Sequence, residues 1–262
     1  MFNTFYYSKI KRFLYEILRI IEDTEKDSTN ICCDPSDLNT VKKLDRIERD
    51  NFLFNFNFIK RTKGNYISIN KILFIMECIK YLEIDIKQLS EILDFNGFET
   101  LIKEILLKNN YFAIKNFRFS DRSNFKSTTS QKRYEIDVIG IYRNYLLIID
   151  AKQWRRKDSF SAMSKAANLQ YRRVLALKKN PDVFANLIHK LLGVSPSIKG
   201  RLPFILMPMM VTLEDNGNRV NNNQIPLVSI YKFNSFLHEF QKYLPYFKTT
   251  EIKKVSIQKK LF

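Results

Sequence analysis

The fold is decided by residues 134–152, which read YEIDVIGIY, then RN, then YLLIIDAK. The first and third pieces are rich in β-branched and aromatic residues and predict two strands, and Arg143-Asn144 between them predict a tight hairpin turn. Residues 146–149 are apolar at every position, which is typical of a strand that is buried on both faces. We therefore expect a β-hairpin whose second strand is central in a sheet.

A two-residue turn fixes the pairing of this hairpin, because partners lie at equal distances from the turn. Asp137 then lies opposite Asp150, and Glu135 opposite Lys152, with all four side chains on one face. Opposed carboxylates repel each other across about 4.5–5.5 Å between their Cβ atoms, unless a cation holds them together. Mg²⁺ suits such oxygen ligands. A three-residue loop, or a bulge at Gly140, would shift the pairing by one residue.

A purely structural interpretation of the same residues stays open. In it, Glu135 and Lys152 form an ion pair, and Asp137 and Asp150 are solvated strand ends. An acid at a strand end is common, and Asp-x-Lys alone is weak evidence. An unpaired carboxylate at the end of a strand as apolar as residues 146–149 would be costly, however, and this favours an active site.

Residues 134–154 resemble the PD-(D/E)xK nuclease superfamily, which includes restriction-type endonucleases and archaeal Holliday-junction resolvases. Asp137 matches the first motif acid, although Ile136 stands where the usual proline would be. Asp150 matches the second acid, and Lys152 matches the motif lysine. The resemblance implies a restriction-endonuclease-like α/β fold, Mg²⁺ or Mn²⁺ as cofactor, and hydrolysis of phosphodiester bonds.

The resemblance covers about residues 95–175 and implies further site residues. Glu99, at the start of the preceding predicted helix, resembles the helix-borne acid of restriction-type members. The implied metal ligands are Asp137, Asp150, Glu99 and the carbonyl of Ala151. Lys152 would orient or deprotonate the attacking water and stabilise the pentacovalent phosphorus. Gln170 lies within an apolar helical stripe and faces either the core or the site; it is a partial match to a helix glutamine of some of these nucleases.

The charge of the chain favours a polyanionic partner. The sequence holds 44 Lys and Arg against 27 Asp and Glu, a net charge of +17. Residues 115–133 and 152–179 have local surpluses of five and eight and flank the acidic residues. The candidate nucleic-acid contacts are Lys132, Arg133, Arg155, Arg156, Lys165, Arg172 and Arg173. The family resemblance favours DNA, and because double-strand cutters often work as pairs, a homodimer is a further expectation.

The N-terminal third, residues 1–94, has a pattern of its own. It predicts helices at 2–23, 38–49, 70–82 and 85–93. The alternation of Phe52, Phe54, Phe56 and Phe58 predicts a strand, and Lys63-Gly64-Asn65 predicts a turn into a strand at 66–69. These patterns predict a mainly helical module with a β-hairpin. Such a module fits a winged-helix-like domain and a plain helical adaptor equally well.

Residues 95–262 predict an α/β domain with a mixed central sheet flanked by helices. Besides the hairpin, the patterns predict helices at 98–108, 159–178 and 235–243, and strands at 111–119, 202–213 and 225–233. We expect Trp154 to pack against the sheet rather than stack on a base.

Several classes of protein are excluded by composition. The three cysteines form no CxxC pair and the two histidines are isolated, so a zinc site is not expected. Neither a signal peptide nor a membrane-spanning run is present, which indicates a soluble cytoplasmic protein. We expect a Mg²⁺-dependent DNA endonuclease of restriction, repair or recombination type. The alternative is a catalytically inactive nuclease-fold protein that binds nucleic acid through its basic surface, and a third class is a scaffold for acidic protein or lipid.

Overall fold

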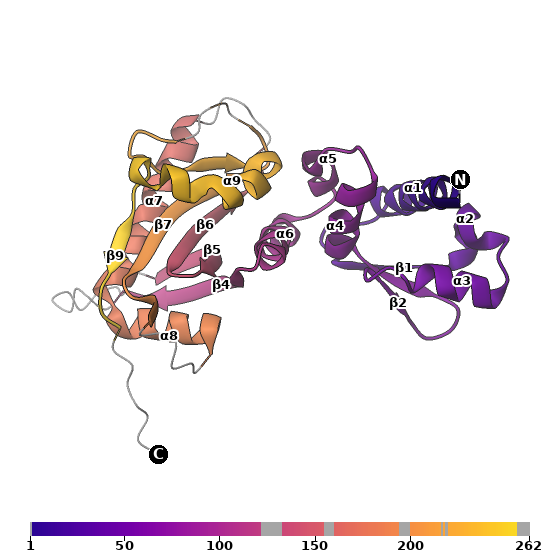
Figure 1. The fold of residues 1–262 in the computed structure, drawn as a ribbon, viewed down its shortest axis with the longest axis horizontal. Helices are drawn as coiled ribbons and strands as arrows, with labels where there is room; N and C mark the ends of the chain where they lie inside the picture. Colours follow the sequence, from indigo (N-terminus) through magenta and orange to yellow (C-terminus); the bar gives the residue numbers. More distant parts are fainter. Residues whose placement is uncertain are drawn as a thin grey trace, which may run out of the picture. The chain divides into compact units, whose positions relative to one another are not determined.

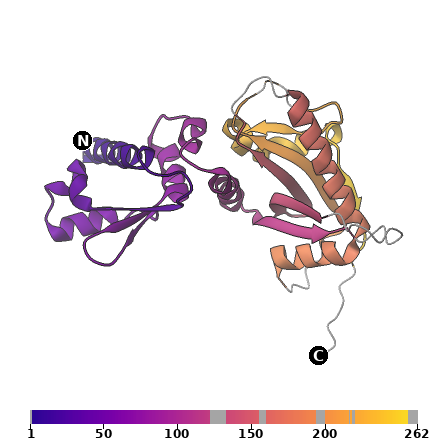
Figure 2. The ribbon, with the colours of Figure 1, turned by 180° about the vertical axis from the view of Figure 1, so that it is seen from behind.

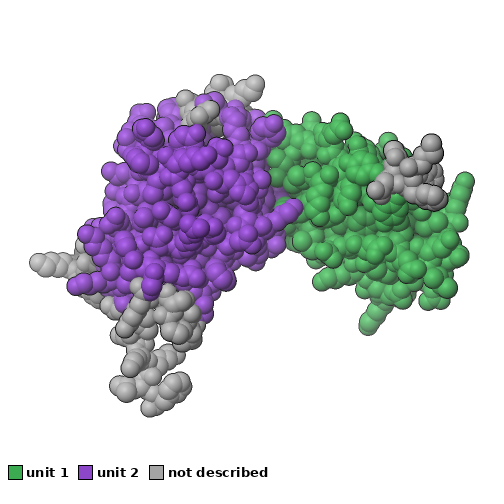
Figure 3. Space-filling model, viewed as in Figure 1, with its two compact units in different colours: residues 1–98 green, residues 99–262 purple. Residues whose placement is uncertain are grey.

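The computed structural model describes residues 2–121, 133–154, 160–193, 200–215, 217 and 220–255. The chain divides into two compact units, Met1–Phe98 and Glu99–Phe262 (Figure 3). The boundary falls inside helix α6 (Phe95–Lys108). Within the described residues, no helix has both the length and the apolar character needed to cross a membrane.

Unit 1 packs helices around a small antiparallel sheet (Figure 1). Its elements in chain order are α1 (Phe2–Glu22), β1 (Asn30–Cys33), the 3-10 helix η1 (Pro35–Asp37), α2 (Asn39–Lys42), α3 (Arg46–Leu53), β2 (Ile59–Arg61), β3 (Ile67–Asn70), α4 (Lys71–Tyr81) and α5 (Ile86–Ser90). Strand β3 is the middle strand and pairs with both β1 and β2. The helix predicted at 38–49 is interrupted, because the Asp45 carboxylate accepts a hydrogen bond from the Glu48 backbone N–H and starts α3 there.

The strand predicted from the alternating phenylalanines is wrong. Phe52 lies in the last turn of α3, and Phe54 to Phe58 form turns that lead into β2. The rings of Phe52 and Phe56 lie 5.6 Å apart, and both contact Phe13 of α1. The alternation therefore reflects a helix end and turns that bury Phe52, Phe56 and Phe58 in one core and leave Phe54 exposed, and not the pleat of a strand.

Unit 2 is built on a mixed sheet of six strands, which confirms the predicted α/β class. The strands are β4 (Phe112–Ser120), β5 (Arg133–Tyr142), β6 (Tyr145–Lys152), β7 (Phe204–Thr212), β8 (Leu227–Ser229) and β9 (Thr250–Ile252), in the order β4-β5-β6-β7-β8, with β9 also on β7. The β4-β5-β6 pairings are antiparallel, and the β6-β7-β8 pairings are parallel. Helix α9 (Ile230–Tyr243) covers one face of the sheet (Figure 1), and α7 (Phe160–Lys179) covers the other (Figure 2).

The predicted hairpin register is confirmed. Tyr142 pairs with Tyr145, and the ladder continues in step as far as Val138 and Ile149. Gly140 is not a bulge, since it pairs in register on both sides. A Cβ at Gly140 would lie 2.9 Å from Cδ1 of Leu106, so the glycine allows α6 to pack closely on the sheet. Strand β6 lies between β5 and β7 with six of its eight residues buried, as its apolar sequence predicts.

Two expectations for the C-terminal half are corrected. The strand predicted at 225–233 is only β8, because Ser229 ends it and α9 begins at Ile230. A helix that was not predicted, α8 (Pro181–Leu192), follows α7 after Asn180, with Pro181 in its first turn.

Candidate active site

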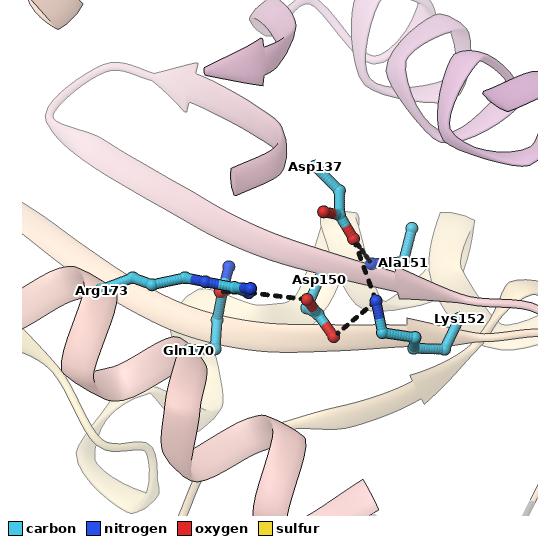
Figure 4. Close-up of polar contacts among 6 residues, drawn as sticks. All are labelled: Asp137, Asp150, Ala151, Lys152, Gln170 and Arg173. Carbon is cyan, nitrogen blue, oxygen red and sulfur yellow. Dashed lines mark hydrogen bonds and ion pairs between the residues drawn. The ribbon is translucent and has the colours of Figure 1, made fainter. Parts of the chain in front are cut away.

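Asp137 and Asp150 lie beside each other at the point where the β5–β6 ladder ends. Their last neighbouring backbone pair is Val138 with Ile149. The ammonium of Lys152 lies 3.4 Å from Oδ2 of Asp137 and 3.3 Å from Oδ2 of Asp150 (Figure 4). The two carboxylates therefore converge on one point from adjacent strands, as the hairpin register predicts.

Backbone and burial hold the Asp137 carboxylate in place. The backbone N–H of Ala151 donates to its Oδ2 over 2.9 Å. Burial and the neighbouring negative charge of Asp150 raise the pKa of Asp137, while Lys152 and the Ala151 N–H oppose that rise. An acid whose ionised form is disfavoured in this way is stabilised by any cation that comes close to it.

Asp150 is 2% exposed and is contacted by two cations. Besides Lys152, the guanidinium of Arg173 donates from Nη1 to its Oδ1 over 2.7 Å. Arg173 is a predicted phosphate contact, but its side chain is 15% exposed and is held by Asp150. The feature of the sequence that indicates this inward position is that Arg173 lies one helical turn after Gln170, on the side of α7 that faces the sheet.

Gln170 is fully buried and belongs to the same cluster (Figure 4). Its Oε1 accepts from Nη1 of Arg173 over 2.6 Å. Among the described residues, its Nε2 has no hydrogen-bond acceptor. Buried polar atoms are nearly always satisfied, so the Nε2 of Gln170 is a donor in this cluster that a bound polar group could satisfy.

Lys152 is a cation in this setting and not a base. Burial alone would lower the pKa of its ammonium, but the charges of Asp150 and Asp137 outweigh burial and raise it. The ion pair between Glu135 and Lys152 in the purely structural interpretation is wrong. Glu135 instead forms an ion pair with Arg118, 2.9 Å away. Arg118 lies on β4, which pairs with the edge of β5 opposite to β6.

Glu99 lies in α6, close enough to Asp137 for their charges to interact. Burial, followed by the Asp137 charge, raises the pKa of Glu99 to about 7, although Lys115 and Lys152 act in the opposite direction. In the part of the chain that the structure describes, no three His, Cys, Asp or Glu side chains gather closely enough to hold a metal. The acidic cluster is thus a pair, Asp137 and Asp150, with Glu99 outside it.

The raised pKa of Glu99 gives the stability of the protein a pH dependence. Between the ordinary glutamate pKa of 4.5 and the folded value of about 7, the folded state binds more protons than the unfolded state, so stability falls as pH rises. We expect Glu99→Gln to match wild type at pH 4.5 and to be roughly 1–2 kcal/mol more stable at pH 8, a value reduced because the half-exposed group is screened. Urea unfolding in EDTA at both pH values measures the difference in the free energy of unfolding between the two proteins. The same difference at pH 4.5 and at pH 8 would contradict the raised pKa of Glu99.

The predicted nucleic-acid contacts lie in several places. Arg133 starts β5, and Lys165 and Arg172 lie on α7; all three are exposed. Lys132, Arg155 and Arg156 lie outside the described residues. Trp154 packs with the buried methionines Met163 and Met210, which confirms its predicted packing role.

The charge surplus belongs to unit 2. Residues 1–98 hold 15 Lys and Arg and 15 Asp and Glu, so residues 99–262 carry the whole surplus of 17. The unit that contains the acidic pair is therefore strongly basic, and a polyanion would be attracted to it.

Fold and site together define an α/β protein with two acids and a lysine converging at the end of a central hairpin. No protein-family model and no curated protein matches the chain.

Among solved structures, the chain is similar to protein VC1899 from Vibrio cholerae, with 12% identity over 91% of this chain and 51% of that one, at a TM-score of 0.35. It is also similar to Can2 from Sulfobacillus thermosulfidooxidans, solved in complex with cyclic tetra-adenylate, with 14% identity over 75% of this chain and 45% of that one, at a TM-score of 0.30. The chain spans about half the length of each structure. Likenesses this distant carry no argument about function.

Proposed function

We propose that this chain is a divalent-metal-dependent nuclease of the PD-(D/E)xK type that hydrolyses phosphodiester bonds in DNA. The observation that carries the proposal is the convergence of Asp137, Asp150 and Lys152 on one point at the end of the hairpin. The proposal includes a restriction-endonuclease-like fold for unit 2, in keeping with its mixed sheet and flanking helices.

The residues present fit a hard divalent cation. Asp137 and Asp150 offer carboxylate oxygens from adjacent strands, and both already attract one cation, the Lys152 ammonium, which lies 3.4 and 3.3 Å from their Oδ2 atoms. These two acids would hold Mg²⁺ or Mn²⁺, with the carbonyl of Ala151 as a further candidate ligand, whereas Glu99 lies outside the pair. The bound ion would polarise the phosphoryl group and acidify a water molecule.

The remaining site residues act through charge and position. The Lys152 ammonium would stabilise the negative charge that develops on the phosphoryl oxygens and would orient the attacking water. Arg173 would hold the Asp150 carboxylate through Oδ1, and Gln170 would in turn hold the guanidinium. The basic surface of unit 2, including Lys165 and Arg172, would attract the phosphate backbone.

A second candidate function rests on the same contacts. The two acids are already balanced by two cations, Lys152 and Arg173. A site neutralised in this way is also what a catalytically inactive nucleic-acid-binding protein with a nuclease fold would have. Cleavage distinguishes the two functions, because only the first requires a divalent ion.

Cleavage of a substrate panel tests the proposal. The panel contains supercoiled plasmid, linear duplex DNA, single-stranded DNA and RNA, each with Mg²⁺, Mn²⁺ or EDTA. We expect metal-dependent cleavage of DNA that falls by about 10²–10⁴-fold in Lys152→Ala. Lys242→Ala is the matched control, since it removes the same charge from an exposed position on α9. Binding without cleavage would support the inactive binder, and equal cleavage by all three proteins would rule out the proposed site.

A further inference from the structure

Unit 1 has the element order and strand order of a winged-helix module. Its order is helix, strand, helix, helix, strand, strand from α1 to β3, and β3 lies between β1 and β2. Helices α2 and α3 are separated by the three residues 43–45, which is the spacing of a helix-turn-helix. In such motifs, the second helix is the one that enters the major groove of DNA.

Charge in unit 1 is balanced overall but strongly polarised. The unit has a net charge of zero, yet residues 42–63 hold seven Lys and Arg against three Asp and Glu. The rest of the unit has the opposite surplus, eight basic residues against twelve acidic ones. The basic segment covers α3, β2 and the start of the β2–β3 loop, so the positive charge collects on the two elements that a winged helix presents to DNA.

The exposed side chains of α3 are ones that read base edges. Arg46, Ile47 and Asn51 all point to solvent, and Ile47 is 74% exposed. A large aliphatic side chain left in water in the first turn of a helix has no role in the core of unit 1. In the major groove, arginine pairs with guanine, asparagine with adenine, and an apolar side chain contacts the thymine methyl group.

The β2–β3 loop is tied to α3. Nη2 of Arg61, at the end of β2, contacts Oδ2 of Asp50 in α3 at 2.6 Å, and its guanidinium lies 5.0 Å from the centroid of the Phe54 ring. The loop closes where Thr62 donates to the backbone carbonyl of Tyr66. Gly64 supplies the positive φ of 78° that the turn requires. Helix and loop are therefore fixed relative to each other before any partner arrives.

We infer that unit 1 binds duplex DNA, with α3 in the major groove, and with Lys60 of β2 and Lys63 of the β2–β3 loop on the phosphate backbone. Figure 1 shows α3 and β2 along one side of unit 1, with α5 on the opposite side. Duplex DNA is favoured over RNA because the major groove of an A-form duplex is too deep and narrow to admit a helix. This DNA contact is separate from the proposed nuclease site in unit 2.

Binding of the full chain to DNA in EDTA tests the inference, since no cleavage can then occur. Fluorescence anisotropy with a 25-base-pair duplex, roughly two turns of DNA, would be measured over a range of salt concentrations. We expect the double variant Lys60→Ala and Lys63→Ala to reduce the slope of log K against log salt by about 2, because two phosphate contacts are lost. The matched control is Lys80→Ala with Lys87→Ala on α4 and α5, which removes the same charge and should keep the wild-type slope.

An RNA duplex of the same sequence separates groove recognition from simple charge attraction. The Lys60→Ala, Lys63→Ala double variant and the control are expected to bind this RNA equally. A double variant with the wild-type slope on DNA, or with an equal loss of slope on RNA, would overturn the inference. Either result is independent of whether the chain cuts DNA, because the metal is absent throughout.

Discussion

Replacement of Asp137 by asparagine is expected to lower metal-dependent DNA cleavage by at least about 10³-fold without destabilising the metal-free protein. The loss arises because asparagine removes one of two charged ligands. The stability is retained because burial and the charge of Asp150 already raise the pKa of Asp137, so the fold disfavours the ionised carboxylate that asparagine replaces. The asparagine Oδ1 can still accept the hydrogen bond of the Ala151 N–H.

Single-turnover cleavage and urea unfolding in EDTA measure the two effects on the same protein. The control is Glu135→Gln, two residues away on β5, whose partner is Arg118 at the surface. We expect this control to cut DNA at nearly the wild-type rate. An Asp137→Asn protein that unfolds much more easily than wild type would mean that the carboxylate is structural, and one that still cuts would remove Asp137 from the mechanism.

Replacement of Arg173 by alanine is expected to destabilise the metal-free protein by about 3 kcal/mol. Asp150 is 2% exposed, and without the guanidinium its one charged partner among the residues that the structure describes is the Lys152 ammonium. Gln170 would also lose the donor to its Oε1. A buried carboxylate that loses a hydrogen-bonded cation is one of the few single changes with so large an effect.

The neighbouring residue provides the control for this measurement. Arg172 is exposed on α7, so Arg172→Ala should change stability by no more than about 0.5 kcal/mol. Addition of Mg²⁺ should raise the melting temperature of Arg173→Ala more than that of wild type, because the bound cation would replace the missing positive charge. Equal stabilities for the two arginine variants would contradict the assigned role of the Arg173–Asp150 contact.

The sequence predicted the centre of unit 2 because that centre is set by local rules. A two-residue turn fixes the register of β5 and β6, and this register brings Asp137 beside Asp150. The apolar run 146–149 identified β6 as a central strand for the same reason, since only a strand covered on both faces needs apolar residues at every position.

Contacts between residues that are far apart in the chain could not be predicted from the sequence. Arg173 reaches Asp150 only because α7 packs across β6, and helical spacing alone did not say which charged residue would turn inward. The alternation of Phe52 to Phe58 was misread for a related reason. The phenylalanines alternate in the sequence as they would in a strand, but burial does not alternate, since a helix end and its following turns bury Leu53 and expose Phe54.

The central claim is that Asp137 and Asp150 together hold a divalent cation. The most direct measurement is an anomalous difference map from crystals of the full chain grown with Mn²⁺, compared with crystals of Asp150→Asn. The account predicts a peak at bonding distance, about 2.0–2.3 Å, from oxygens of both carboxylates in the wild-type protein, and none in the variant. A wild-type map without a peak, with the Lys152 ammonium still between the two acids, would contradict it.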